Sequence, residues 1–184
     1  MTKNLKLSSG AFFELIINSE YDYSKRKSDE YETDVILKID NFRILICSDY
    51  LNFIVSKMQQ HLNILEELEL LKEFELYKIG IAFNDYLFSI DNEKELNEDY
   101  LKENNDVWIG SKYLLFELPK KLATWLFALN GKYYLEITPL YEKHFIDSDE
   151  SSYIDFVANF KTLEKIELTN DDVEGLKNLI NSFL

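Results

Sequence analysis

Four side chains in the C-terminal third of the chain have types that could support acid–base or metal chemistry: Glu136, His144, Asp147 and Asp149. A histidine among carboxylates can transfer protons or ligate a cation. Their spacing matches no metal-binding motif, and the only other histidine lies far away in sequence. We therefore interpret Asp147, Asp149 and Glu150 as a solvated turn. An enzyme with a carboxylate–histidine site near Glu136 and His144 remains an alternative.

Other motifs that carry catalysis or hold cofactors are not found. The five glycines are too scattered to form a phosphate-binding loop of either common pattern. The single cysteine, Cys47, excludes an internal disulfide and a cysteine-based zinc site within one chain. Cys47 lies in an apolar run and is expected to be a small buried hydrophobic residue. The sequence therefore predicts no cofactor and no metal.

Charge is the strongest global feature of the chain. It has 34 acidic and 20 basic residues and a formal net charge of -14. Such a surface repels phosphate backbones, which argues against direct binding of nucleic acid, and it attracts a basic protein partner. One stretch, 91–106, is rich in acids and is expected to be an exposed loop or a frayed helix. The candidate partner-binding acids are Glu93, Glu95, Glu98, Asp99 and Asp106, with Asp147, Asp149 and Glu150 as a second set.

Three apolar alternations indicate the elements that would position these residues. They are centred on Asp40-Asn41, Asn84-Asp85 and Asn130-Gly131, which are dipeptides that tolerate the positive φ of tight hairpin turns. We therefore expect three β-hairpins, and Asn130-Gly131 is the strongest of the three signals.

The third hairpin carries aromatic residues on one face. A two-residue turn at Asn130-Gly131 pairs Phe127 with Tyr134 and Trp125 with Glu136. This face is either covered by the fold, for which the C-terminal helix is a candidate, or open to a partner, for which Trp125 and Tyr134 would be anchors. We favour coverage by the fold.

Helical spacing of apolar residues predicts a long helix over 49–73, with Ser48 or Asp49 as its cap. A C-terminal helix is expected to begin at Thr169 or Asn170, and a short helix is expected in "YIDFVANF". "AFFELII", "VWIGSKYLLFEL" and "LEKIELT" are expected to be strands. The predicted fold is α+β, with one domain over 1–184 in which a mainly antiparallel sheet packs against the long helix and the C-terminal helix.

The hairpin and helix in "DVILKIDNFRILICSDYLNFIVSKMQQHL" and the aromatic hairpin "ATWLFALNGKYYLEITPLY" resemble the layout of bacterial immunity proteins of toxin–immunity pairs. The resemblance implies a non-catalytic protein that binds a usually basic toxin and blocks its active site. A phage-encoded inhibitor of a host defence nuclease, such as an anti-CRISPR protein, is the alternative, because an acidic surface can occupy a nucleic-acid channel. With no secretory signal or bilayer-spanning segment, the protein is expected in the cytoplasm, away from membranes. The sequence does not fix its oligomeric state.

Overall fold

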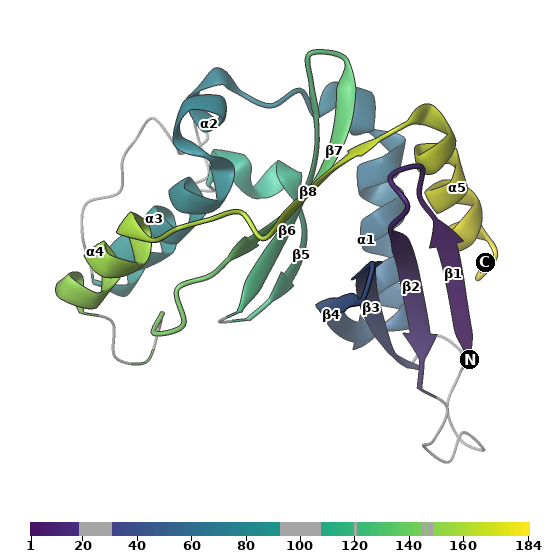
Figure 1. The fold of residues 1–184 in the computed structure, drawn as a ribbon, viewed down its shortest axis with the longest axis horizontal. Coiled ribbons are helices and arrows are strands. Elements are labelled where there is room, and N and C mark those ends of the chain that lie inside the picture. The colour runs from purple at the N-terminus through teal and green to yellow at the C-terminus, as the bar shows by residue number, and fades with distance from the viewer. Residues whose placement is uncertain (19–30, 93–107, 120, 145, 147–148) are drawn as a thin grey trace.

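The computed structural model describes residues 1–18, 31–92, 108–119, 121–144, 146 and 149–184. Its described strands form two four-stranded antiparallel sheets, as Figure 1 shows, and the predicted α+β class is confirmed. Sheet A has the order β1-β2-β3-β4 and sheet B the order β5-β6-β7-β8. The strands of sheet A are Thr2–Lys6, Phe12–Ile17, Glu32–Ile39 and Phe42–Tyr50. Those of sheet B are Leu114–Leu118, Leu122–Leu129, Lys132–Pro139 and Glu164–Leu168.

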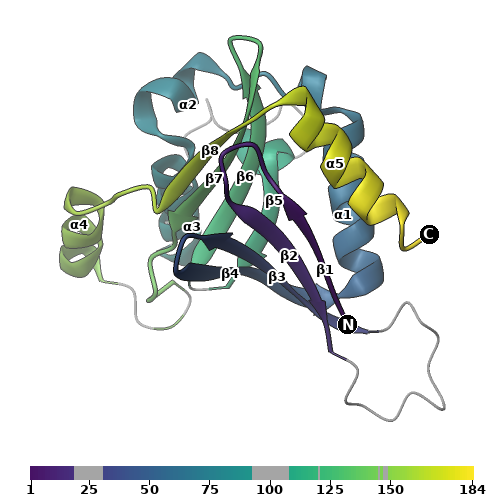
Figure 2. The same cartoon turned by 45° about the vertical axis from the view of Figure 1, so that its right-hand side comes forward.

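Helices connect and cover the two sheets. The α-helices are α1 (Leu51–Asn63), α2 (Lys72–Tyr77), α3 (Ile79–Asp91), α4 (Glu150–Ala158) and α5 (Asn170–Asn181). Two short 3-10 helices are η3 (Leu65–Glu67) and η5 (Ile109–Tyr113). In Figures 1 and 2, α1 and α5 lie on one side of the molecule, and α2, α3 and α4 lie together on the far side of sheet B.

Two of the three predicted hairpins are confirmed. Asp40, with φ of 50°, turns β3 into β4. Asn130 and Gly131, with φ of 52° and 76°, turn β6 into β7, because asparagine and glycine adopt the left-handed region at low cost. The register pairs Phe127 with Tyr134 and Trp125 with Glu136, as predicted.

The second predicted hairpin is wrong, because its residues form α3. Asn84 was expected in a turn but is fully buried. Its side-chain amide donates to the carbonyl oxygens of Gly80, at 2.7 Å, and Pro139, at 3.1 Å. Its Oδ1 accepts from the Tyr141 N–H at 2.7 Å. These bonds tie α3 to the end of β7, so tertiary contacts and not a turn fix the conformation of this asparagine.

The predicted helix over 49–73 is broken into α1, η3 and α2. Between the last two, the backbone at Leu68 and Leu70 makes hydrogen bonds of 2.9 and 2.8 Å to Ala128 in β6, which draws the chain along sheet B. The predicted caps are also wrong. Ser48 and Asp49 belong to β4, which runs directly into α1, and no side chain caps that helix.

The C-terminal elements follow the prediction, with Thr169 and Asp172 forming a capping box at the start of α5. The short helix in "YIDFVANF" and the strands in "AFFELII" and "LEKIELT" are also found, as α4, β2 and β8. The segment "VWIGSKYLLFEL" is a strand only in its second half, because η5 precedes β5. Within the described residues, no helix combines the length and the apolar character needed to cross a membrane.

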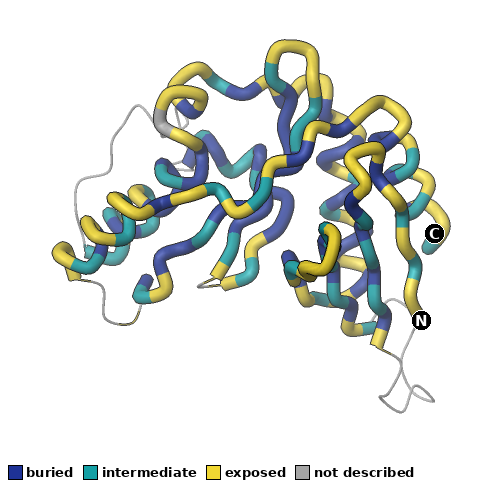
Figure 3. The backbone as a smooth tube through the Cα atoms, in the orientation of Figure 1, coloured by how far each residue is buried: buried dark blue, intermediate teal, exposed yellow. Residues whose placement is uncertain are grey.

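Both faces of β6 are buried, as the dark blue centre of Figure 3 shows. Trp125 and Phe127 on one face, and Leu126 on the other, are at most 1% exposed. The Trp125 face is covered by Phe83 of α3, with ring centroids 5.3 Å apart, and by Trp108, at 5.9 Å. The fold therefore covers the aromatic face as predicted. The covering elements are α3 and Trp108, and not the C-terminal helix that was the candidate.

Candidate functional site

Glu136 and His144, the pair considered for acid–base chemistry, have different partners. Glu136 lies in β7 and is 5% exposed. Its carboxylate forms an ion pair with Lys165 at 3.0 Å and accepts from the Thr162 hydroxyl at 3.1 Å. These contacts connect β7 to β8 and to the segment before it, so Glu136 has a structural role in holding this edge of sheet B.

His144 is also in the interior, at 2% exposure. Its Nε2 is 3.2 Å from Asn84 Oδ1, which can only accept, so Nε2 carries the proton. Burial lowers the pKa of His144 to about 4, although Asp91, whose Oδ2 is 3.9 Å from Nδ1, opposes the shift. The imidazole is therefore neutral near pH 7 and packs between the rings of Tyr141 and Tyr153. Within the described part of the chain, no three histidine, cysteine or acidic side chains group as metal ligands would.

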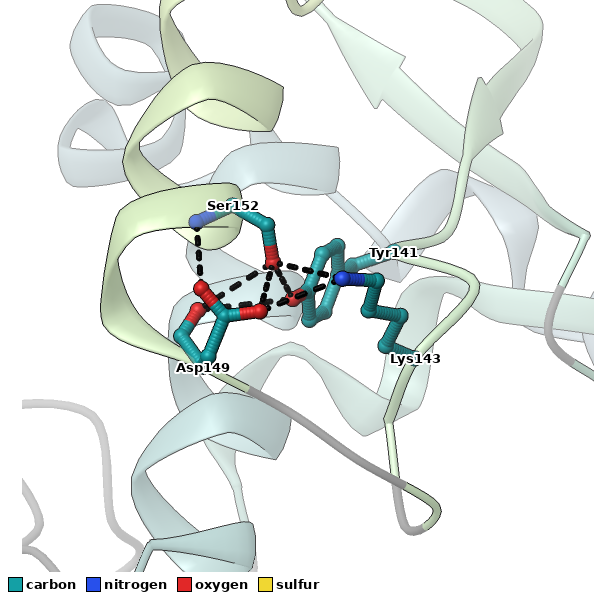
Figure 4. A network of polar contacts seen from close by, with 4 residues as sticks. All are labelled: Tyr141, Lys143, Asp149 and Ser152. Carbon is teal, nitrogen blue, oxygen red and sulfur yellow. Dashed lines mark hydrogen bonds and ion pairs between the residues drawn. The ribbon is translucent and has the colours of Figure 1, made fainter.

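Asp149 lies at the start of α4, in the polar network of Figure 4. It accepts from the Ser152 N–H at 2.8 Å and from the Ser152 hydroxyl at 2.6 Å, and it pairs with Lys143 at 3.1 Å. The Ser152 hydroxyl also shares a hydrogen bond with the Tyr141 hydroxyl. A cavity of about 610 Å³ lies beside these residues, between the end of β7 and α4.

Serine, lysine and tyrosine together raise the possibility of a nucleophile, but this network lacks a base. Activation of a serine needs a neighbouring group that can take its proton. Hydrogen bonds from Ser152 and Lys143 lower the pKa of Asp149 to about 2, which makes it a very weak base. Lys143 is held as a cation by the same carboxylate. The arrangement therefore caps α4 and does not activate Ser152.

Of the two predicted aromatic anchors, Trp125 is unavailable to a partner. It is 0% exposed, and its indole N–H donates to the Thr138 hydroxyl at 2.8 Å. Tyr134 is half-buried and stacks on Phe127 at a centroid separation of 5.8 Å. The ammonium of Lys165 lies 5.0 Å from the Tyr134 ring centroid. Tyr134 thus keeps some exposed surface, but its ring belongs mainly to sheet B.

Most of the predicted acidic candidates cannot be placed. Six of them lie outside the described residues, namely Glu93, Glu95, Glu98, Asp99, Asp106 and Asp147. Glu150 is described and is exposed in the first turn of α4.

Exposed acids that were not among the predicted candidates lie on η3, α2 and α4, together with the predicted Glu150. In α2 the side chain of Leu76 is 79% exposed, and in α4 that of Ile154 is 60% exposed. Exposed acids lie along the same elements as these two aliphatic side chains. They are Glu66, Glu67, Glu69, Glu73 and Glu75 before or on α2, and Glu150 and Asp155 on α4. We call these residues, with Leu76 and Ile154, the acidic helical surface; its exposed segments are yellow in Figure 3.

The local pattern of the sequence does not indicate that Leu76 is exposed. If the apolar stripe of α1 is continued at helical spacing, Leu76 has to be placed with the buried residues, whereas a separate short helix around buried Phe74 places it outward. Leu76 is therefore a large aliphatic side chain exposed among glutamates.

Comparison with known proteins identifies no relative, since no protein-family model, curated protein or solved structure matches this chain.

Proposed function

We propose that this chain is a non-enzymatic binding protein of the cytoplasm that neutralises a basic protein partner, as an immunity protein neutralises a bacterial toxin. The observation that carries the proposal is the acidic helical surface, in which exposed carboxylates lie along the elements that expose Leu76 and Ile154. The separate partners of Glu136 and His144, both in the interior, give the enzyme alternative no such support.

The two kinds of side chain have different tasks in this proposal. The carboxylates raise the rate of encounter with a basic partner, since complementary charge steers association. The aliphatic side chains contribute affinity, because burying one leucine or isoleucine is favourable by about 1.5–3 kcal/mol. A partner that fits would present lysine or arginine around two apolar depressions.

A basic nuclease is a partner of this kind, because the groups that bind phosphates also bind carboxylates. A nuclease toxin would make the chain an immunity protein, and a host defence nuclease would make it a phage-encoded inhibitor of the anti-CRISPR type. Both roles use the same exposed acids, so the genes beside this one would distinguish them.

The test is a pull-down from the native host lysate at low and moderate salt, with two variants of matched charge. E73K/E75K reverses two acids on α2, and D171K/E174K reverses two acids on α5, which lies apart from α2 in Figure 1. We expect one stoichiometric basic protein that salt weakens, that E73K/E75K loses and that D171K/E174K retains. If both variants lose the partner equally, overall charge and not the acidic helical surface determines binding. Retention by both, or no partner at either salt, would contradict the proposal.

A further inference from the structure

One face of sheet A is open. On the inner face, Phe13, Leu15, Val35 and Leu37 are at most 1% exposed and belong to the main core. Figures 1 and 2 show α1 and α5 on this side of the sheet, and no helix among the described residues over the opposite side. The outward side chains alternate with the buried ones, and those in the two central strands are only half-buried. We call this surface the open face.

The strand register arranges the open face in three rows that run across the four strands. The first row is basic around one phenylalanine, the second has Glu14 beside two aliphatic residues, and the third contains one carboxylate. Lys6, Phe12, Lys38 and Arg43 form the first row, Asn4, Glu14, Ile36 and Leu45 the second, and Thr2, Ile16, Asp34 and Ser48 the third.

Charged side chains lie in all three rows of this face. Arg43 is paired with Glu14 of the second row at 3.0 Å. Lys38 lies beside the Phe12 ring, with its ammonium 5.8 Å from the centroid. Asp34 accepts a hydrogen bond from the Ser48 hydroxyl at 2.7 Å, and this uncharged donor does not compensate the negative charge of Asp34. Within the described residues, neither Lys38 nor Asp34 forms an ion pair.

We propose that the open face binds the open face of a second copy of this chain. A two-fold axis that lies midway between the two sheets, parallel to the second row, reverses the strand direction and exchanges the first and third rows. Lys38 then faces the second copy's Asp34, and Phe12 faces the second copy's Ile16. On the axis Ile36 meets its own counterpart, and so does Glu14, which is paired with Arg43 of its own chain. Sheets pack face to face at about 10 Å, so these side chains meet directly.

The fit is self-complementary for the Lys38–Asp34 and Phe12–Ile16 pairs, whereas the two copies of Glu14 oppose each other and keep their own Arg43 partners. Four strands at about 4.8 Å spacing and three rows give a contact of only some hundreds of Å² on each copy. The dimer is therefore weak, and the net charge of -14 on each copy opposes it further at low salt. The acidic helical surface lies on elements outside sheet A, so this inference does not depend on the proposed function.

The test is sedimentation equilibrium of the full chain from micromolar to sub-millimolar concentration, with charge reversals. We expect a reversible wild-type dimer. K38E and D34K should each weaken it by about tenfold or more, because each reversal acts twice in a two-fold interface and opposes like charges. The double variant K38E/D34K restores the opposite charges and should return the dimer to near wild-type strength.

Two further variants separate this pairing from other causes. K72E makes the same charge change as K38E on α2, away from the open face, and should leave the dimer unchanged. Ile36→Arg places two cations on the axis and should abolish the dimer, while circular dichroism checks that each variant is folded. A wild-type chain that stays monomeric, single reversals without effect, or a double variant that does not recover would each overturn the proposal.

Discussion

Asp172 connects parts of the chain that are far apart in sequence, and replacing it tests how the fold is held together. Asp172 is 5% exposed and lies in the first turn of α5. Its carboxylate accepts from the Ser8 N–H at 2.8 Å and from the Ser8 hydroxyl. It also accepts from the N–H and the hydroxyl of Thr169, both at 2.9 Å. One side chain therefore joins the turn between β1 and β2 to the start of α5.

The cost of Asp172→Ala follows from the groups it leaves without a partner. Loss of a helix cap costs about 1 kcal/mol. A hydrogen bond to a charged group contributes about 1.5–3 kcal/mol, and the two bonds from Ser8 leave together. Since such terms are not additive, we expect a loss of about 3 kcal/mol in the free energy of unfolding. With a urea dependence of about 2 kcal/mol per molar, the unfolding midpoint should fall by about 1.5 M.

Asp171→Ala is the matched control, because Asp171 lies in the same helical turn and is exposed. It removes the same charge near the helix N-terminus, an effect of about 0.5 kcal/mol. Urea unfolding followed by tryptophan fluorescence measures both variants. If the two midpoints agree, the hydrogen bonds of Asp172 do not stabilise the fold as argued, and its contribution is only that of its charge.

The same pair of variants has a predicted pH dependence. Burial alone would raise the pKa of Asp172, but the hydrogen bonds from Ser8 and Thr169 lower it below its usual value. A carboxyl with a lowered folded pKa contributes stability above its unfolded pKa of about 4, and this is lost as the pH falls through the folded pKa. The difference between wild type and Asp172→Ala should therefore shrink at acid pH, and Asp171→Ala is measured in parallel as the control.

Two further predictions concern His144 and the glycines. Burial lowers the pKa of His144 to about 4 in the folded chain, whereas the pKa of an unfolded histidine is about 6.5. Between these two pH values the unfolded chain binds more protons than the folded chain, so stability should fall as the pH is lowered across this window. The full shift corresponds to about 3 kcal/mol, and after a discount for solvent screening we expect a loss of about 1–2 kcal/mol in the free energy of unfolding. Urea unfolding at each pH measures this loss, which should be absent in His144→Gln. In Gly80→Ala the new Cβ would lie 2.6 Å from the Thr138 hydroxyl, so we expect a loss of about 2 kcal/mol and a lower melting temperature. In Gly175→Ala the new Cβ meets only the flexible end of the Leu5 side chain, at 3.0 Å, so the change in stability should stay within about 1 kcal/mol. An equal loss of stability in Gly80→Ala and Gly175→Ala would contradict this explanation.

The hairpins at Asp40 and Asn130 could be predicted because their signals are local. A dipeptide that accepts positive φ lies between two alternating runs, and the register then follows from the turn. The capping box at Thr169 is equally local, since both of its members lie within one turn of α5. Local rules therefore gave two hairpins and the last helix, but not the arrangement of the strands as two separate sheets.

The segment around Asn84 shows where local rules stop. Alternation and a helical stripe are hard to separate when most residues are apolar, and α3 has buried residues at Ile79, Ala82 and Phe83. An Asn-Asp pair between apolar runs then favours a turn. In the structure the asparagine is in a helix because Pro139 and Tyr141, more than fifty residues away, supply its hydrogen-bonding partners. No window of the sequence contains both sides of that interaction.

The acidic helical surface was missed for a related reason. Apolar residues at helical spacing continue beyond Asn63, so a single helix over 49–73 is the simplest local solution. The break comes from Leu68 and Leu70, whose backbone bonds to Ala128 in a strand that forms much later in the chain. Once the chain is held there, α2 starts anew and buries Phe74, and Leu76 is turned outward among the glutamates. The surface that carries the proposed function is thus a product of the contact between η3 and sheet B, and a change at Ala128 that disturbs this contact should alter partner binding without touching an acidic residue.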